Sequence, residues 1–187
     1  MEYDTDYWNK YTDDNESKHN EEFSKFIRDL AISLRSNNVL EVGCNSGNDL
    51  SNFSNDFDVH GVDLNEHALD IAKKKFPSFK FKNGSIIDLP YEDSSIDFVF
   101  THYVLNYLSE NEIDKAISEL FRVSKKYILT CELSDENKSI LDGDIKAWKR
   151  NVYKKWLNFQ VKIISDVDMH EDIEPKKPRF TLVKKIR

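Results

Sequence analysis

The chain has 187 residues, a mass of 22.0 kDa and a formal net charge of -7 at pH 7. Its length fits one domain, at roughly 100–200 residues each, and a content of 39% hydrophobic and 12% aromatic residues excludes a disordered chain. The excess of acids argues against a nucleic-acid partner, because such binding depends on Lys and Arg neutralising phosphates.

The N-terminal part begins with an acidic segment that contains aromatic residues. Tyr3, Tyr7, Trp8 and Tyr11 stand among acids, and such side chains need a surface to cover. We therefore expect residues 1–36 to form a lid segment followed by a helix; packing on a neighbouring helix is the alternative. Apolar residues recur at helical spacing from residue 23 to 34, which predicts an amphipathic helix over 16–36.

From residue 39 onward, strand and helix patterns alternate. Apolar runs predict strands at 39–43, 58–62, 79–82, 96–101 and 127–131. Helical patterns lie at 46–54, between Asn65 and Pro77, and after the capping box of Ser109 and Glu112. A last helix is suggested by Ile145, Trp148, Val152 and Trp156.

The C-terminal part breaks this alternation, because residues 161–167 and 180–186 are two strand candidates with no helix between them. Successive strands without a crossover run antiparallel. We therefore predict an α/β fold, a Rossmann-like three-layer α-β-α sandwich with a mostly parallel seven-stranded sheet and one antiparallel strand near the C-terminus. No linker or repeat interrupts the chain, so residues 1–187 should form a single domain.

The loop after the first strand, Glu-Val-Gly-Cys-Asn-Ser-Gly-Asn-Asp-Leu at 41–50, is the first candidate for ligand binding. Open parallel sheets bind ligands beyond the carboxyl ends of their strands, where the strand order reverses. Gly43 and Gly47 allow a tight turn, and Asp63, twenty residues after Gly43, is placed to hold the hydroxyls of a ribose. Each signal has an ordinary structural explanation; together they predict a nucleoside-like ligand.

The glycine spacing opposes two common nucleotide sites. A G-x-G-x-x-G fingerprint would need glycines where Asn45 and Asn48 stand, and no G-x-x-x-x-G-K run is present. On its Glu41-x-Gly43-x-x-x-Gly47 motif, the chain resembles the class I S-adenosylmethionine-dependent methyltransferases. Segments 61–65, 85–90 and 95–100 match the same family in order. The chain looks closest to small methylases associated with the biosynthesis of pseudaminic acid, a bacterial surface sugar, on residues 7–9, 41–47, 121–132 and 148–150.

This resemblance implies S-adenosylmethionine as cofactor and S-adenosylhomocysteine as its product. Glu41 would lie near the cofactor's ammonium, Asp63 would hold the ribose hydroxyls, and Asp88 would accept from the adenine amino group. Asn45 replaces the middle glycine of the motif and can adopt a left-handed backbone at more cost than Gly. The implied cofactor contacts are Tyr11, Glu41, Gly43, Asn45, Gly47, Asp63, Leu64, Ile87, Asp88 and Thr101.

His102, at the mouth of the fourth strand, is the candidate catalytic base. An unperturbed imidazole pKa of about 6.5 suits proton removal near neutrality; the alternative is a partly buried His bonded to backbone. Lys149 and Arg150 would grip the carboxylate of an acidic sugar, although a solvated helix face explains the pair equally well. The expected substrate contacts are Tyr7, Trp8, Tyr103, Asn106, Lys149 and Arg150.

We therefore predict an enzyme that methylates a small molecule, such as a surface-sugar or nonulosonic-acid intermediate. A non-catalytic methyltransferase-like binding or partner module stays open, as does a nicotinamide-dependent enzyme, which the glycine register opposes. No apolar run approaches the roughly 20 residues of a membrane helix, so we expect a cytoplasmic protein without a membrane partner. Two cysteines and five scattered histidines favour neither a disulfide framework nor a metal site.

Overall fold

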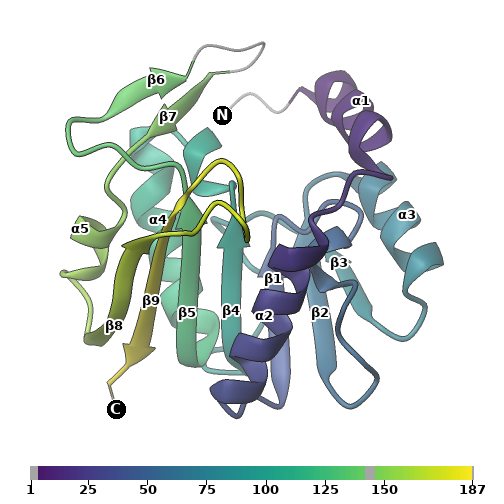
Figure 1. Cartoon of the computed structure of the whole chain (residues 1–187), viewed down its shortest axis with the longest axis horizontal. Helices are drawn as coiled ribbons and strands as arrows, with labels where there is room; N and C mark the ends of the chain where they lie inside the picture. Colours follow the sequence, from purple (N-terminus) through teal and green to yellow (C-terminus); the bar gives the residue numbers. More distant parts are fainter. Residues whose placement is uncertain (1–3, 142–145, 187) are drawn as a thin grey trace.

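The centre of the structure is a seven-stranded sheet in the order β3-β2-β1-β4-β5-β9-β8 (Figure 1). The computed structural model describes residues 4–141 and 146–186. Neighbouring strands are parallel except β9, which runs antiparallel to both β5 and β8. The strands are β1 Asn38–Val42, β2 Asp58–Asp63, β3 Lys80–Asn83, β4 Ile96–His102, β5 Ser124–Glu132, β8 Val161–Asp168 and β9 Arg179–Lys185. The predicted α/β class and the single antiparallel strand are confirmed.

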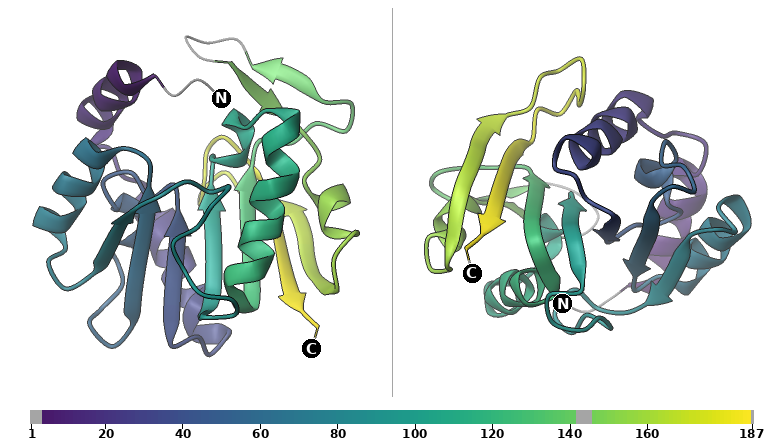
Figure 2. Two further views of the ribbon diagram at one scale, coloured as in Figure 1. Left: turned by 180° about the vertical axis from the view of Figure 1, so that it is seen from behind. Right: turned by 90° about the horizontal axis from the view of Figure 1, so that it is seen from below.

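Helices cover both faces of the sheet, with α2 on one face and α4 on the other (Figure 2). Successive residues of β1 point to opposite faces, so Val39 joins the core under α2 and Leu40 the core under α4. This two-sided burial explains why the strands read as continuous apolar runs. The helices are α1 Thr5–Asn15, α2 Glu21–Ser33, α3 Glu66–Lys75, α4 Glu110–Val123 and α5 Tyr153–Trp156, with short 3-10 turns η1 Asn48–Leu50 and η2 Leu105–Tyr107.

The helix predicted over 16–36 was too long at both ends, because only Glu21–Ser33 is helical in that range, as α2, and a separate helix, α1, precedes it. Asn20 caps the second helix, its side chain accepting from the Phe23 N–H at 3.0 Å. The first helix, α1, carries the aromatic residues of the expected lid segment. Tyr3 lies outside the described residues.

Two further helix predictions were too long. Only residues 48–50 of the predicted helix 46–54 are helical, as a 3-10 turn that starts after Gly47 with φ 77°. Trp148 lies in strand β7, Ala147–Lys149, which pairs with β6, Ser139–Leu141, while Ile145 lies outside the described residues. Among the described residues of this stretch, only Tyr153–Trp156 is helical, as the one-turn helix α5.

The parallel strands bring their carboxyl ends to one edge of the sheet. After β1 the chain builds β2 and β3 on one side and then returns to build β4 on the other side. The strand order therefore reverses between β1 and β4, which is where open α/β sheets bind their ligands. The loop at 169–178 between β8 and β9 reaches the same edge (Figure 1).

Candidate functional site

A cavity of about 350 Å³ lies over the carboxyl ends of β1, β2 and β4. Its volume is at the small end of the range for ligand pockets, roughly 300–1,000 Å³. The loops after β1, β2, β3 and β4 form its wall, and α1, the α1–α2 linker and the β8–β9 loop cover it. The residues predicted from sequence that line it are Trp8, Tyr11, Glu41, Gly43, Asn45, Asp63, Leu64, His102 and Tyr103.

The loop after β1 requires glycine at one position and tolerates asparagine at another. Gly43 has φ 78°, and a Cβ there would lie 2.3 Å from Val104 Cγ2. Asn45 adopts the left-handed conformation expected of the missing glycine, with φ 45°. Its side-chain oxygen accepts from the Ser46 N–H at 2.6 Å, a local bond that stabilises this backbone. The replacement of glycine therefore leaves the loop intact.

Asp63 ends β2 and faces the cavity. Its two carboxylate oxygens accept from the N–H groups of Asn45, at 2.7 Å, and Asn65, at 2.8 Å. Burial raises the pKa of this carboxyl, and the N–H donors oppose the shift. Each carboxylate oxygen has two lone pairs, so Asp63 is fixed in place and retains acceptor capacity for hydroxyls of a ligand.

Glu41, on β1, is 3% exposed and lines the cavity. Burial, together with the nearby charges of Asp49 and Asp63, raises the pKa of its carboxyl well above the usual value. Among the described residues, its Oε2 atom has no hydrogen-bond partner. A buried polar atom without a partner is costly, which points to a donor supplied by a ligand, such as an ammonium.

His102 is held with one ring nitrogen bonded and the other free. Its ring stacks on Phe23, with the centroids 3.8 Å apart, and Nδ1 lies 2.7 Å from Asp49 Oδ2. A carboxylate accepts, so Nδ1 carries the proton of this bond, and the neutral tautomer that the bond selects has no proton on Nε2. The His102 side chain is 9% exposed, and Nε2 has no hydrogen-bond partner in the described part of the chain.

Glu174, from the β8–β9 loop, closes this side of the cavity. It is 6% exposed and accepts from Asn20 Nδ2 at 2.7 Å and from Tyr103 Oη at 3.0 Å. Its Oε2 lies 3.9 Å from His102 Nε2. Sequence reasoning missed Glu174 because it stands in a loop without periodicity or motif. Asp49 was also missed, although it lies in the loop at 41–50 that was the first candidate for ligand binding.

Glu132 shapes the turn after β4 from beneath the cavity. It ends β5 at 1% exposure and accepts from Thr101 Oγ1 at 2.8 Å, from the Val104 N–H at 3.3 Å and from the Asn106 N–H at 3.4 Å. Burial raises the pKa of its carboxyl to about 7. This turn presents Tyr103, which has φ 56°, to the cavity.

Two residues expected at the ligand serve the framework instead. Thr101 is fully buried and bonds Glu132, so it was wrongly assigned to the cofactor. Asn106 is 2% exposed and links the residue after β5 to strand β7. Its side chain donates to the Leu133 and Trp148 carbonyls and accepts from the Leu133 N–H. Asn106 is therefore not a substrate contact in this structure.

The basic pair expected to grip a carboxylate lies away from the cavity. Arg150 is 5% exposed, donates to the Leu108 carbonyl at 2.6 Å and packs over the Trp148 ring at 5.2 Å. Lys149 lies beside it in β7 and does not line the cavity. The structure therefore places neither residue at the cavity, and Lys149 lies in a β-strand rather than on the helix face that was the alternative.

Four other predicted contacts lie next to the wall rather than in it. Tyr7 packs on Trp8 and Tyr11, and Gly47 has Phe76 and Phe81 behind it. Ile87 and the exposed Asp88 follow Ile86, which does line the cavity. The roles of these four residues stay predictions.

The described residues contain no helix long and apolar enough to cross a membrane. Across residues 4–141 and 146–186, no three His, Cys, Asp or Glu side chains are grouped so as to hold a metal ion.

Residues 39–127 match the family described as a methyltransferase domain. An uncharacterized protein of Haemophilus influenzae is 33% identical over 122 residues, 58% of this chain and 49% of that protein. The tRNA N(3)-methylcytidine methyltransferase trm140 of Schizosaccharomyces pombe is 27% identical over 140 residues, covering 64% and 45%. This chain thus spans about half the length of these curated relatives.

Solved structures share the fold over nearly the whole chain. An S-adenosylmethionine-dependent methyltransferase from Clostridium acetobutylicum has a TM-score of 0.71 at 17% identity, covering 95% of this chain and 98% of that one. Magnesium protoporphyrin IX methyltransferase (ChlM) from Synechocystis, with bound SAH, has a TM-score of 0.70 at 14% identity, covering 87% and 82%. At these identities the likeness shows a shared fold.

The burial of Glu132 predicts a specific pH dependence of stability. Its pKa of about 7 in the folded state exceeds the usual 4.5, so its contribution is present in full below pH 4.5 and lost as the pH rises through 7. Over this window the loss amounts to about 3 kcal/mol. Glu132→Gln should flatten the decline in the free energy of unfolding between pH 5 and 8, measured by urea denaturation. The exposed Glu92→Gln should keep the wild-type slope; an equal slope in Glu132→Gln would contradict the assignment.

Proposed function

We propose that this chain, which carries a methyltransferase domain, transfers the methyl group of S-adenosylmethionine to a small-molecule acceptor. The observation that carries the proposal is the joint placement of Glu41, Gly43 and Asp63 around one cavity at the strand-order switch. Asp63 offers acceptors for ribose hydroxyls, and Leu64 a surface for adenine. Gly43 gives bare backbone, and the unpartnered Glu41 Oε2 an acceptor for the cofactor's ammonium.

The charge of the wall supports the same cofactor. Glu41, Asp49 and Asp63 all line the cavity, and S-adenosylmethionine carries both an ammonium and a sulfonium. Carboxylates in a partly desolvated wall stabilise such charges more strongly than carboxylates in bulk water do. The ligand would in turn satisfy the Glu41 oxygen that lacks a donor.

Bound S-adenosylmethionine supplies a methyl group already activated by positive sulfur. The chain's own task is to align the acceptor with that methyl and to exclude water. We infer that His102 removes a proton from the acceptor at Nε2, and that Asp49 holds the ring in the required tautomer and stabilises the imidazolium. The aromatic residues of α1 would act as a lid, because Trp8 packs edge-to-face on Tyr107 at 5.1 Å.

A small molecule suits this site better than RNA. The relative from fission yeast is named as a tRNA methyltransferase, but this chain has a net charge of -7 and a cavity of about 350 Å³, the size of a small ligand. The resemblance to methylases of surface-sugar biosynthesis supports a sugar or nonulosonic-acid intermediate as acceptor. A binding module without catalysis would hold the cofactor and give no turnover.

Calorimetry tests the cofactor assignment. We expect the protein to bind S-adenosylmethionine and S-adenosylhomocysteine but not NAD, and Asp63→Asn to raise both dissociation constants about 10- to 100-fold, since it weakens hydrogen bonds to a charged group. Asp70→Asn, on the exposed side of α3, is the matched control and should bind normally. Wild-type affinity in Asp63→Asn would remove the ribose contact from the proposal.

The role of His102 is tested with methyl-labelled cofactor and a panel of small-molecule acceptors. His102→Gln should lower kcat about 100-fold or more, the usual range for general-base catalysis, while the cofactor's dissociation constant changes little. His170→Gln removes an exposed imidazole from the β8–β9 loop and should leave turnover unchanged. Undiminished kcat in His102→Gln would show that the acceptor needs no base from this residue.

The lid assignment predicts a role for α1 in cofactor binding. Trp8→Ala should weaken cofactor binding roughly 10-fold by opening the aromatic wall above the cavity. Lys10→Ala, exposed on the same helix, should have no effect in the same calorimetric titration. If both variants bind like the wild type, α1 is a packed helix and not a lid.

A further inference from the structure

We propose that the acceptor atom is the nitrogen of a primary amine, bound against His102 and Glu174 beneath the aromatic side chains of α1 and η2. This inference rests on the proposed function and adds to it the chemical class of the acceptor. Three independent features of the cavity lead to it: the hydrogen-bond acceptors that His102 and Glu174 present, the aromatic wall, and the distribution of charge.

Two hydrogen-bond acceptors face each other without a donor between them. His102 Nε2 has no partner in the described residues and lies 3.9 Å from Glu174 Oε2. Nδ1 already donates to Asp49, so the neutral tautomer that this bond selects has no proton on Nε2. For a nitrogen about 2.8 Å from both atoms, the angle between its two hydrogen bonds, Nε2···N···Oε2, would be roughly 90°. An amine has two or three protons for such an arrangement, whereas a hydroxyl has one.

The aromatic wall favours a cation as well. Trp8, Tyr11, Tyr103 and Tyr107 all line the cavity, and Trp8 meets Tyr11 and Tyr107 edge-to-face at 5.5 and 5.1 Å. Burial raises the pKa of the Tyr11, Tyr103 and Tyr107 phenols, which keeps them neutral. Neutral aromatic faces attract ammonium groups through the negative potential over the ring.

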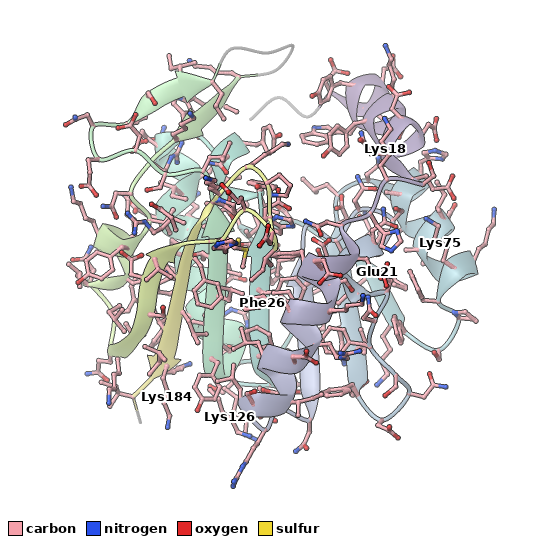
Figure 3. The ribbon with its side chains drawn as sticks, viewed as in Figure 1. Lys18, Glu21, Phe26, Lys75, Lys126 and Lys184 are labelled. Atoms are coloured by element: carbon pink, nitrogen blue, oxygen red, sulfur yellow. The ribbon has the colours of Figure 1, made fainter. Side chains whose placement is uncertain are left out.

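The charges are arranged to repel an anionic acceptor group at the reacting end. The carboxylates of Asp49 and Glu174 are held in the wall beside His102. The basic residues of the cavity, Lys18, His19 and Lys176, are exposed at its rim, and Figure 3 shows Lys18 below α1. Solvent screens charges at the rim more than charges in the wall. Arg150, the expected carboxylate partner, is buried elsewhere.

The step balances with the cofactor of the proposed function. The bound ammonium gives one proton to His102 Nε2, and the nitrogen lone pair that this frees forms the N–C bond with the methyl. The C–S bond breaks, its electron pair returns to sulfur, and the products are a methylated ammonium and neutral S-adenosylhomocysteine. The imidazolium releases its proton to solvent. Before the transfer, once Nε2 has released its proton, the neutral amine turns so that its two N–H groups face Nε2 and Glu174 and its lone pair faces the methyl.

The test uses the protein saturated with S-adenosylhomocysteine, with n-propylammonium, 1-propanol and propionate as probes. Ring resonances of His102, assigned with His102→Gln, report binding by NMR. We expect n-propylammonium to shift these resonances and the other two probes to leave them unchanged. Glu174→Gln should weaken the ammonium probe at least ~10-fold, as for a lost charge-assisted hydrogen bond. Asp172→Asn, with a side chain 87% exposed on the same loop, should bind like the wild type.

The outcomes separate this inference from the proposed function. If S-adenosylhomocysteine does not bind, the proposed function fails and the inference fails with it. If it binds and propionate or propanol shifts His102 as strongly as the ammonium, or the ammonium does not bind, only the inference is overturned. Retained S-adenosylhomocysteine binding shows that Glu174→Gln is folded, and the comparison of probes on the wild-type protein needs no variant.

Discussion

The close contact between the loop after β1 and the turn after β4 is the constraint on which the site depends. Gly43 has room for a hydrogen only, because Val104 Cγ2 occupies the place of a Cβ. The Val104 N–H is in turn held by Glu132 from the end of β5. The carboxyl ends of β1, β4 and β5 are thereby fixed to one another, and these contacts determine the shape of the cavity wall. Glu41 and His102 then face the same space, although 61 positions separate them in the chain.

Much of this arrangement was predictable from the sequence, and the limits have physical causes. Residues 39–43 and 96–101 were recognisable as strands because burial on both faces makes them apolar throughout. Glu41, Gly43 and Asp63 were recognisable because backbone conformation and ribose chemistry restrict those positions. Glu174 was not, since its place in the site comes from tertiary packing between Asn20 and Tyr103. Local sequence carries no trace of such contacts.

The errors have the same origin. Trp148 fits a helical period with Val152 and Trp156, but it lies in a hairpin, and strand pairing depends on a partner strand that periodicity does not reveal. Thr101 stood at the correct strand end, yet its hydroxyl is used by Glu132 below the cavity. The position of a residue on a strand predicts how near it lies to the cavity. The direction of its side chain depends on the hydrogen bonds that buried neighbours make with it.

The insertion of β9 between β5 and β8 has a consequence for how the chain folds while it is being translated. A nascent chain that has emerged through residue 132 already contains the five strands β1 to β5 and the Glu41 and Asp63 side chains that line the cavity. Until β9 follows, β5 has an unpaired edge, the kind of surface that aggregates or recruits chaperones. Glu174 arrives with that same hairpin. Protection of the sheet and completion of the cavity wall are thus a single event, which follows the synthesis of β9.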